Sequence, residues 1–262
     1  MPTALTIAGS DSSAGAGIQA DLKTFAAHGV YGTCAVTAVT AQNTLGVVTW
    51  MALPADLVTA QIEAVVGDLG ADAVKVGMLA NAAIVEAVGA AIDALELRHV
   101  VVDPVMVAKG GASLLADEAI GAMRAELLPR ALVLTPNVPE AAMLADTVIR
   151  TVEDMRHAAS RIRALGPGIV VVKGGHLDGP ESIDVVCTGD TTFELRRPRV
   201  ATAHTHGTGC TFSSAIAANL ALGRSIQDAV EEARAYVDGA IRHAPGLGRG
   251  HGPLEHFWKP NA

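Results

Sequence analysis

The residues best suited to chemistry lie in a glycine-rich stretch, Gly207-Thr208-Gly209-Cys210, in the last quarter of the sequence. An apolar, helix-like segment follows at once. The free N–H groups and positive dipole at a helix start attract anions. A cysteine in a first helical turn often has its pKa lowered from about 8.5 toward roughly 3.5–7.5. The glycine loop (Gly207-Thr208-Gly209) therefore predicts an anion site beside a reactive thiol, and a tight turn before a buried cysteine is the alternative.

Charged side chains follow three apolar, strand-like runs. Asp103 follows three valines, Asn137 and Glu140 follow LVLTP, and Lys173 follows three more valines. Ligands of open α/β sheets bind beyond the carboxyl ends of the strands, so these groups are expected at one rim. Carboxylates suit Mg²⁺ that also binds water and substrate phosphates. Each residue alone is more commonly a cap or turn residue, but together they suggest phosphoryl transfer from a magnesium nucleotide.

Two other motifs carry less weight. Gly15, Gly17 and Ala20 imitate a dinucleotide-binding fingerprint, but several residues separate them from the first strand, and no acidic residue ends the second. No GxxxxGK[ST] motif is present, so the chain is not expected to be a P-loop protein. His204 and His206 could bind a metal, but no third ligand lies near them in the sequence.

The elements that must position these residues alternate along the chain. Short β-branched runs predict strands, and longer alanine-rich segments bounded by Gly, Pro or capping residues predict helices. The strands are expected at Ala4–Ala8, Thr33–Ala41, Ala73–Gly77, His99–Asp103, Leu132–Thr135 and Ile169–Lys173. The helices are expected at Ile18–His28, Ala55–Leu69, Ala80–Leu95, Leu115–Leu127, Val152–Leu165, Thr208–Leu222 and Ile226–His243.

This alternation indicates an α/β fold. Nearly continuous apolar strands are typical of a parallel sheet covered by helices on both faces. Ser182–Gly189 and Thr191–Val200, joined through Thr-Gly-Asp-Thr, predict a hairpin that adds an antiparallel edge. No linker, composition break or internal repeat divides the sequence. We therefore expect a single domain over residues 1–262, with a mostly parallel sheet in a three-layer α/β/α arrangement.

Charge and composition narrow the function. The 262 residues include 19 Lys and Arg against 27 Asp and Glu, a net charge of −8, which disfavours nucleic-acid binding. The three cysteines have no CxxC spacing, so neither a disulfide framework nor a cysteine-rich zinc site is expected. No uncharged apolar run reaches about 18 residues, so no membrane span is expected. We expect a cytoplasmic protein.

The motifs together resemble a known family. AGSDSSAGAGIQADLKTF, TAVTAQNT, VGML, VVDPVM, LTPNVPEA, VVKGGH and HTHGTGCTFSSAIAANLA occur in this order across nearly the whole chain. This set is similar to the hydroxymethylpyrimidine/phosphomethylpyrimidine kinases of thiamine biosynthesis, which have a ribokinase-like fold. One departure is Ala14, where the family usually has glycine. A loop that needed a positive φ at this position would be strained by alanine.

The resemblance implies two successive transfers from ATP with Mg²⁺. The first goes to the hydroxymethyl oxygen of 4-amino-5-hydroxymethyl-2-methylpyrimidine, and the second goes to the resulting monophosphate. By the same resemblance, Gln42 binds the pyrimidine edge and Met78 and Val105 line its face. Gly9 belongs to the same substrate site, and Asp21 lies near the substrate hydroxyl.

The resemblance also assigns the phosphate-handling residues. Cys210 takes the position of the catalytic base, and the glycine loop forms the anion hole, with Thr208 also contacting the nucleotide. Asp103 and Glu140 organise Mg²⁺ through water, and Lys173 contacts a nucleotide phosphate. Similar kinases are often homodimers. Two alternatives stay open: a pyridoxal/pyridoxine kinase with the same fold, and a non-catalytic pyrimidine-binding regulator.

Overall fold

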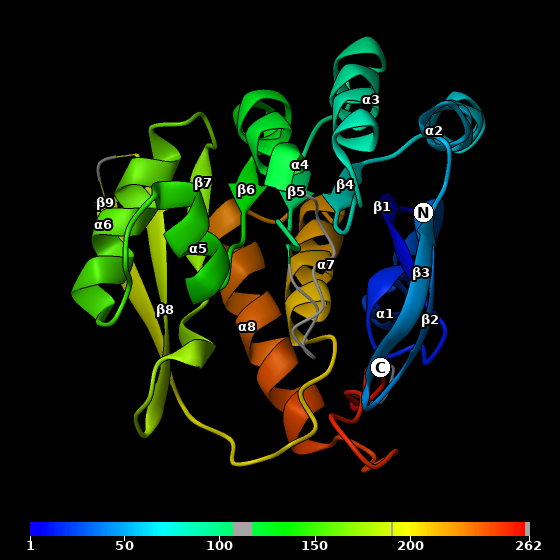
Figure 1. Cartoon of the computed structure of the whole chain (residues 1–262). Helices are drawn as coiled ribbons and strands as arrows, with labels where there is room; N and C mark the ends of the chain where they lie inside the picture. The colour runs from blue at the N-terminus through cyan, green and yellow to red at the C-terminus, as the bar shows by residue number, and fades with distance from the viewer. Residues whose placement is uncertain (107–116, 190, 260–262) are drawn as a thin grey trace.

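The computed structural model describes residues 1–106, 117–189 and 191–259, and its centre is one nine-stranded sheet. Figure 1 shows this sheet running across the molecule in the order β3-β2-β1-β4-β5-β6-β7-β8-β9. The strands are β1 (Thr3–Asp11), β2 (Tyr31–Asn43), β3 (Gly46–Ala52), β4 (Ala73–Val76), β5 (Val100–Val102), β6 (Val133–Leu134), β7 (Ile169–Val172), β8 (Glu181–Thr188) and β9 (Thr191–Pro198).

The strand order reverses direction once, at β1. The chain first builds outward from β1 through β2 to β3, then crosses back to place β4 on the other side of β1. The strands β2, β1, β4, β5, β6 and β7 pair in parallel. At one edge β3 pairs antiparallel with β2, and at the other β8 pairs antiparallel with β7 and β9 with β8. In open α/β sheets a ligand crevice forms where the order reverses. The topology therefore places the expected site beyond the carboxyl ends of β1 and β4.

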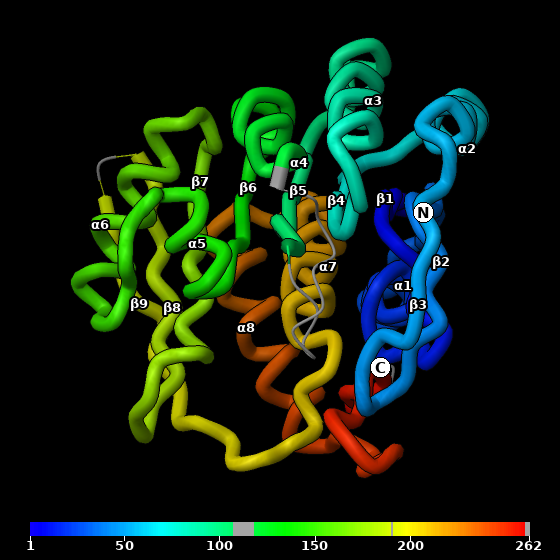
Figure 2. The backbone as a smooth tube through the Cα atoms, in the orientation of Figure 1, coloured from blue at the N-terminus to red at the C-terminus, as the bar shows by residue number. Residues whose placement is uncertain are grey.

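Helices cover both faces of the sheet (Figure 2). Successive strand residues face opposite layers, as the pleat requires: Val100 and Val102 pack in one hydrophobic cluster, and Val101 packs in the other. The first layer contains α2 (Ala55–Leu69), α3 (Ala82–Ala94), α4 (Asp117–Ala122), α5 (Val138–Ala145) and α6 (Val152–Arg163); the second contains α1 (Gly17–Ala27), α7 (Thr208–Ala221) and α8 (Ile226–Arg242). This arrangement confirms the predicted three-layer fold and the antiparallel hairpin.

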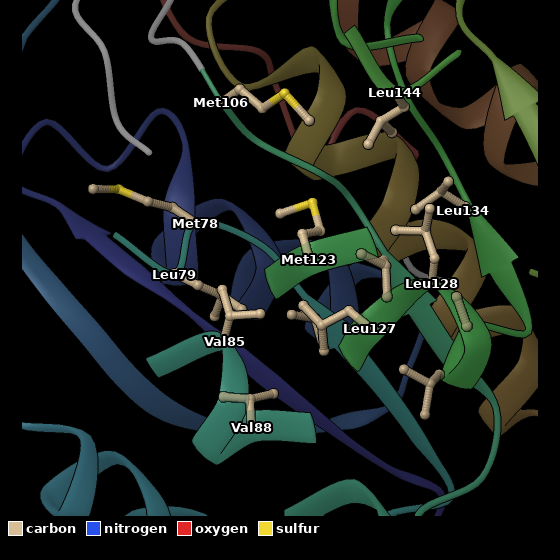
Figure 3. Packing of buried hydrophobic residues seen from close by; sticks show 14 of the residues in the cluster. Met78, Leu79, Val85, Val88, Met106, Met123, Leu127, Leu128, Leu134 and Leu144 are labelled. Carbon is tan, nitrogen blue, oxygen red and sulfur yellow. The ribbon is translucent and has the colours of Figure 1, made fainter. Parts of the chain in front are cut away.

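The first of these layers packs around long aliphatic and methionine side chains. Figure 3 shows Met123 and Leu127 beside Leu79 and Val85 of the α3 region, with Leu128 and Leu134 continuing the cluster. Met78 lies at the margin of this cluster, where the core meets the ligand-facing end of the sheet. The wall of the expected substrate site is therefore continuous with the core.

Three features differ from the sequence-based expectations. A strand, β3, pairs antiparallel with β2 and makes a second antiparallel edge that was not predicted. A short helix, α5, was also missed; it begins at Asn137 with a capping box that involves Glu140. The helix expected over Leu115–Leu127 is α4 followed by one π-helical turn at Met123–Leu127. Its first two positions lie outside the described residues.

Within the three described ranges, no helix has both the length and the apolar character needed to cross a membrane.

Candidate active site

A cavity of about 770 Å³ opens at the carboxyl ends of the central strands. It includes all the predicted site residues except Asp21. These residues come from segments far apart in the sequence: the ends of β1, β2, β5 and β7, the start of α5, and the start of α7. The predicted residues that line it are Gly9, Gln42, Met78, Asp103, Val105, Glu140, Lys173, Gly207, Thr208, Gly209 and Cys210.

The glycine loop forms the start of α7 as predicted. Gly207 precedes the first helical residue and has a φ of +81°, a conformation that favours glycine. A Cβ on Gly207 would overlap the carbonyl oxygen of Gly15, so the loop also needs glycine for its close approach to the β1–α1 loop. The Gly209 and Cys210 backbone lies in the first turn of α7 and lines the cavity, and a helix start of this kind suits a phosphate.

Cys210 lies in the first turn of α7 and lines the cavity. The lowered pKa expected from its helical position is wrong for the free protein. Burial raises the pKa of the Cys210 thiol to about 11, and the nearby carboxylates of Asp21 and Asp103 add to the rise. Lys75 and a hydrogen bond from the Gly17 N–H oppose it without cancelling it. The side chain is therefore a thiol at neutral pH.

Asp21 does not line the cavity, and its predicted place near the substrate hydroxyl stays a prediction. Its carboxylate is fully buried on α1, where it accepts hydrogen bonds from Thr6 Oγ1 at 2.6 Å and Ser214 Oγ at 2.6 Å. It also pairs with Lys75 at 2.8 Å, and that lysine does line the cavity. Burial disfavours the charge on Lys75, but Asp21 outweighs this effect and raises the lysine pKa. In this structure Asp21 therefore holds Lys75, which does line the cavity.

Lys75 itself was missed in the sequence. A lysine inside the apolar strand β4 was the available signal, because a buried charge requires a partner. Gly77 leaves room for it: a Cβ there would lie 2.6 Å from Lys75 Nζ.

Asp103, Lys173 and Glu140 form the charged rim that was predicted. Lys173 Nζ donates to Asp103 Oδ1 at 2.7 Å. Glu140 Oε2 accepts the Asn137 N–H at 2.8 Å, so this residue caps α5 and lines the cavity at once. Burial raises the pKa of Glu140 to about 7 against the positive charge of Lys173, and Asp103 adds to the rise. The rim thus holds a carboxyl group that binds its proton more tightly than a solvent-exposed glutamate does.

No three His, Cys, Asp or Glu side chains gather into a metal-binding group within the part of the chain that the structure describes. His204 and His206 accordingly do not belong to such a cluster.

The end of the cavity expected to hold a pyrimidine combines one amide with apolar walls. Gln42 is the penultimate residue of β2 and is half-buried, and Met78 and Val105 line the same cavity. A Cβ on Gly9 would lie 3.0 Å from Met78 Sδ, so glycine keeps that side of the cavity open. An amide between apolar walls can hydrogen-bond the edge of a flat heterocycle that packs against those walls.

An aspartate–histidine pair beside Gln42 was not predicted. Asp11 and His206 are both buried, with 2.8 Å between Asp11 Oδ2 and His206 Nε2. Burial opposes the charge on Asp11, but hydrogen bonds from His206 and from Ser13 lower its pKa to about 2. A carboxylate beside a histidine was not visible in the sequence, because the two residues are 195 positions apart.

The opposite end of the cavity reaches the β9 and α8 region. Its apolar lining there is provided by Val200, Val237 and Ile241. Arg199 also lines this end, and its guanidinium is held by backbone carbonyls, among them Gly179 at 2.9 Å and Gly175 at 2.9 Å. None of these residues was predicted. An apolar slot at the far side of the anion loop suits a nucleotide base.

Known proteins are similar to this chain in sequence. The chain is 48% identical to the hydroxymethylpyrimidine/phosphomethylpyrimidine kinase of Bacillus subtilis, an alignment that covers 97% of this chain and 94% of that protein. It is 47% identical to a thiamine biosynthesis bifunctional protein of Geobacter sulfurreducens and covers 52% of that longer protein.

A solved structure gives the same fold. The ADP complex of Bacillus subtilis pyridoxal kinase matches with a TM-score of 0.91 and 40% identity, over 98% of this chain and 97% of that one. The ribokinase-like fold class is therefore confirmed, and a phosphotransferase is indicated. A model of the phosphomethylpyrimidine kinase family matches residues 11–255, and the chain belongs to that family.

Proposed function

We propose that the chain acts as a single catalytic domain in thiamine biosynthesis. It transfers the γ-phosphoryl group of ATP to the hydroxymethyl oxygen of 4-amino-5-hydroxymethyl-2-methylpyrimidine, and a second phosphoryl group to the monophosphate. The observation that carries the proposal is the order of groups along one cavity. Gln42 lies at the end of β2 toward one edge of the sheet, and the glycine loop and Cys210 begin α7, which packs on the central strands β1, β4 and β5. Val200, which follows β9, lines the cavity from the other edge.

This order supports an in-line transfer. The pyrimidine would pack against Met78 and Val105 with its edge on Gln42, which directs the hydroxymethyl group toward Cys210. The γ-phosphate would lie against the glycine loop, whose N–H groups stabilise charge on the transferring oxygens. Phosphoryl transfer depends mainly on such positioning and electrostatics.

Cys210 then acts first as a hydrogen-bonding partner of the substrate hydroxyl. With a pKa of about 11 it is protonated at neutral pH, so it does not start as a thiolate base. The loose transition state of phosphoryl transfer needs little proton removal before the new bond forms. The thiol can therefore orient the hydroxyl oxygen without first being ionised.

The charged rim fits a magnesium ion. Among the described residues Glu140 is a buried carboxyl that no lysine contacts directly, and Asp103 already shares Lys173. Two carboxylates suit Mg²⁺ that completes its shell with water and phosphate oxygens. When bound, the ion would neutralise charge on the nucleotide phosphates. Asp103 and Glu140 would hold it through water, and Lys173 and Thr208 would contact the phosphates themselves.

The proposal extends to a homodimer in the cytoplasm. The dimer is supported by exposed apolar side chains on the edge strand β3, namely Val48, Trp50 and Met51. The cytoplasmic location is carried over as the expectation stated from the sequence.

One experiment separates the candidates. ADP release is measured with the aminopyrimidine, its monophosphate and pyridoxal as acceptors. We expect release with the first two. Release with pyridoxal alone would favour the rival function, which is supported by the 0.91 TM-score to a pyridoxal kinase. Release with none of them would overturn the proposal and favour the pyrimidine-binding regulator.

A further inference from the structure

Gln42 belongs to a chain of four polar side chains. His206 Nε2 lies 2.8 Å from Asp11 Oδ2 and 3.4 Å from Gln42 Nε2. On the other side of the amide, Thr40 Oγ1 lies 3.2 Å from Gln42 Oε1 and 3.0 Å from the Ser10 carbonyl oxygen. Asp11, Thr40, Gln42 and His206 all line the cavity. Their protons can be assigned from the acceptors that each group faces.

The proton on His206 Nε2 is fixed by Asp11. This carboxylate, with a pKa of about 2, can only accept, so Nε2 must carry a hydrogen and donate it. The assignment is the same for a neutral ring and for a charged one. An N–H donor at Nε2 cannot accept a hydrogen from the Gln42 amide nitrogen.

Turning the Gln42 amide by half a rotation resolves the conflict. The oxygen and nitrogen of an amide have nearly the same shape, so their places are decided by the hydrogen-bond network. When the amide oxygen faces His206, this oxygen accepts a hydrogen bond from the His206 Nε2–H, which also donates to Asp11. With nitrogen toward Thr40, it donates to Oγ1, and the threonine hydroxyl donates to the Ser10 carbonyl. Every donor in the chain then has an acceptor except the second N–H of the Gln42 amide, which is left for a ligand.

We propose that His206 is a positioning residue that, held by Asp11, fixes the amide of Gln42 with its oxygen on the His206 side and its nitrogen on the Thr40 side. Gly15 makes room for this arrangement, because a Cβ there would overlap the His206 ring. The proposal rests on the proposed function and deepens it, since it states which edge of a pyrimidine the site accepts.

The fixed amide selects one hydrogen-bond pattern. A 4-aminopyrimidine has an amino donor beside the N3 acceptor, which match the amide oxygen and the remaining amide N–H. The 4-oxo analogue, in its N3–H form, has the opposite order of donor and acceptor. A fixed amide meets that analogue with two mismatched pairs, whereas an amide free to turn satisfies both. His206 therefore makes the site selective for the amino compound.

The test compares the two acceptors in His206→Leu and His206→Gln. Leucine removes the N–H, whereas glutamine offers an N–H at a similar reach and is the matched control. We expect the parent protein to prefer the amino over the 4-oxo compound in kcat/KM by about tenfold or more, with the preference in His206→Leu reduced to within about threefold. His206→Gln should keep most of the preference. A purely structural role would lower both rates without changing their ratio.

The outcomes distinguish a wrong proposed function from a wrong role of His206. A parent protein that phosphorylates neither pyrimidine refutes the proposed function, and the role of His206 falls with it. An active parent without the preference, or an unchanged preference in His206→Leu, refutes only the role of His206. An equal loss in His206→Gln assigns the effect to shape and also refutes it. Should His206→Leu fail to fold, Thr40→Val removes the other anchor of the amide on a strand position, and an unchanged preference there counts against the proposal.

Discussion

Replacing Glu140 by glutamine should stabilise the free protein above neutral pH. The Glu140 side chain is 4% exposed, and burial raises its pKa to about 7. Ionisation of Glu140 is therefore less favourable in the folded state than in the unfolded chain. Glutamine keeps a carbonyl oxygen for the Asn137 N–H, which Glu140 Oε2 accepts at 2.8 Å, but it carries no charge. The α5 cap is retained, and the unfavourable ionisation is removed together with the hydrogen bond that the carboxylate accepts from the Met106 N–H.

The magnitude and sign follow from proton linkage. The rise in pKa from 4.5 to about 7, at about 1.4 kcal/mol per pH unit, amounts to about 3 kcal/mol. Because the folded state holds this proton more tightly, the free energy of unfolding falls as pH rises from 4.5 to 7. Below that window Glu140 is protonated in both states. The advantage of Glu140→Gln should therefore be near zero at pH 4.5 and full above pH 7.

Urea unfolding of both proteins across this pH range measures the effect. Glu63→Gln is the matched control, because Glu63 is exposed on α2 and its substitution should leave the curve unchanged. A gap between parent and Glu140→Gln that does not change with pH would refute the reasoning, since it would show that packing and not ionisation separates the two proteins. The added stability should come with reduced kinase activity, as is common where a site holds an unfavourable charge.

Four further outcomes are expected. Cys210→Ala should lower kcat by about 10²-fold with little change in the KM for ATP, measured by ADP release, because the substrate hydroxyl loses the thiol that orients it. Near-parental turnover would make Cys210 a packing residue. Gln42→Leu should lower kcat/KM for the aminopyrimidine by roughly ten- to a thousand-fold, because two polar groups of the pyrimidine lose their hydrogen-bond partners at about 1–3 kcal/mol each. Equal losses of kcat/KM with pyridoxal would show that Gln42 does not distinguish the two rings. Asp103→Asn should raise the Mg²⁺ concentration for half-maximal rate by about tenfold or more, and a parental Mg²⁺ titration would contradict its assignment. Ala14→Gly should raise the free energy of unfolding by about 0.5–1 kcal/mol, because Ala14 has a φ of +58°; a lower value in urea unfolding would show that chain entropy outweighs the strain.

The fold was predictable because its signals are local. Apolar runs such as Val100–Val102 and Val170–Val172 have the composition of buried parallel strands, and each is followed by the charged residue that reaches the rim. The edge strand β3 was missed for the converse reason. Four of its residues in a row, Val48 to Met51, are exposed, so no buried face imposes an alternating pattern.

The site was predictable in its members but not in its electrostatics. The position of Cys210 at a helix start was correct, yet its pKa depends on burial and on Asp21 and Asp103, which come from distant parts of the chain. Asp21 illustrates the same limit. From the sequence, a carboxylate on α1 could contact either a substrate or a buried lysine. Asp21 pairs with Lys75 because β4 packs against α7, and this packing is not visible in the sequence.

The junction of the β1–α1 loop with the loop before α7 has a consequence for how the molecule assembles. Asp11 and His206 meet across 195 residues, so their contact closes a loop that spans most of the chain. Neighbouring strand–helix units can form from local contacts, whereas so distant a pairing costs more chain entropy and comes later. A partly folded chain can thus already have much of its sheet and core while it still lacks a finished glycine loop. Catalytic competence is consequently expected only after this distant pairing has formed.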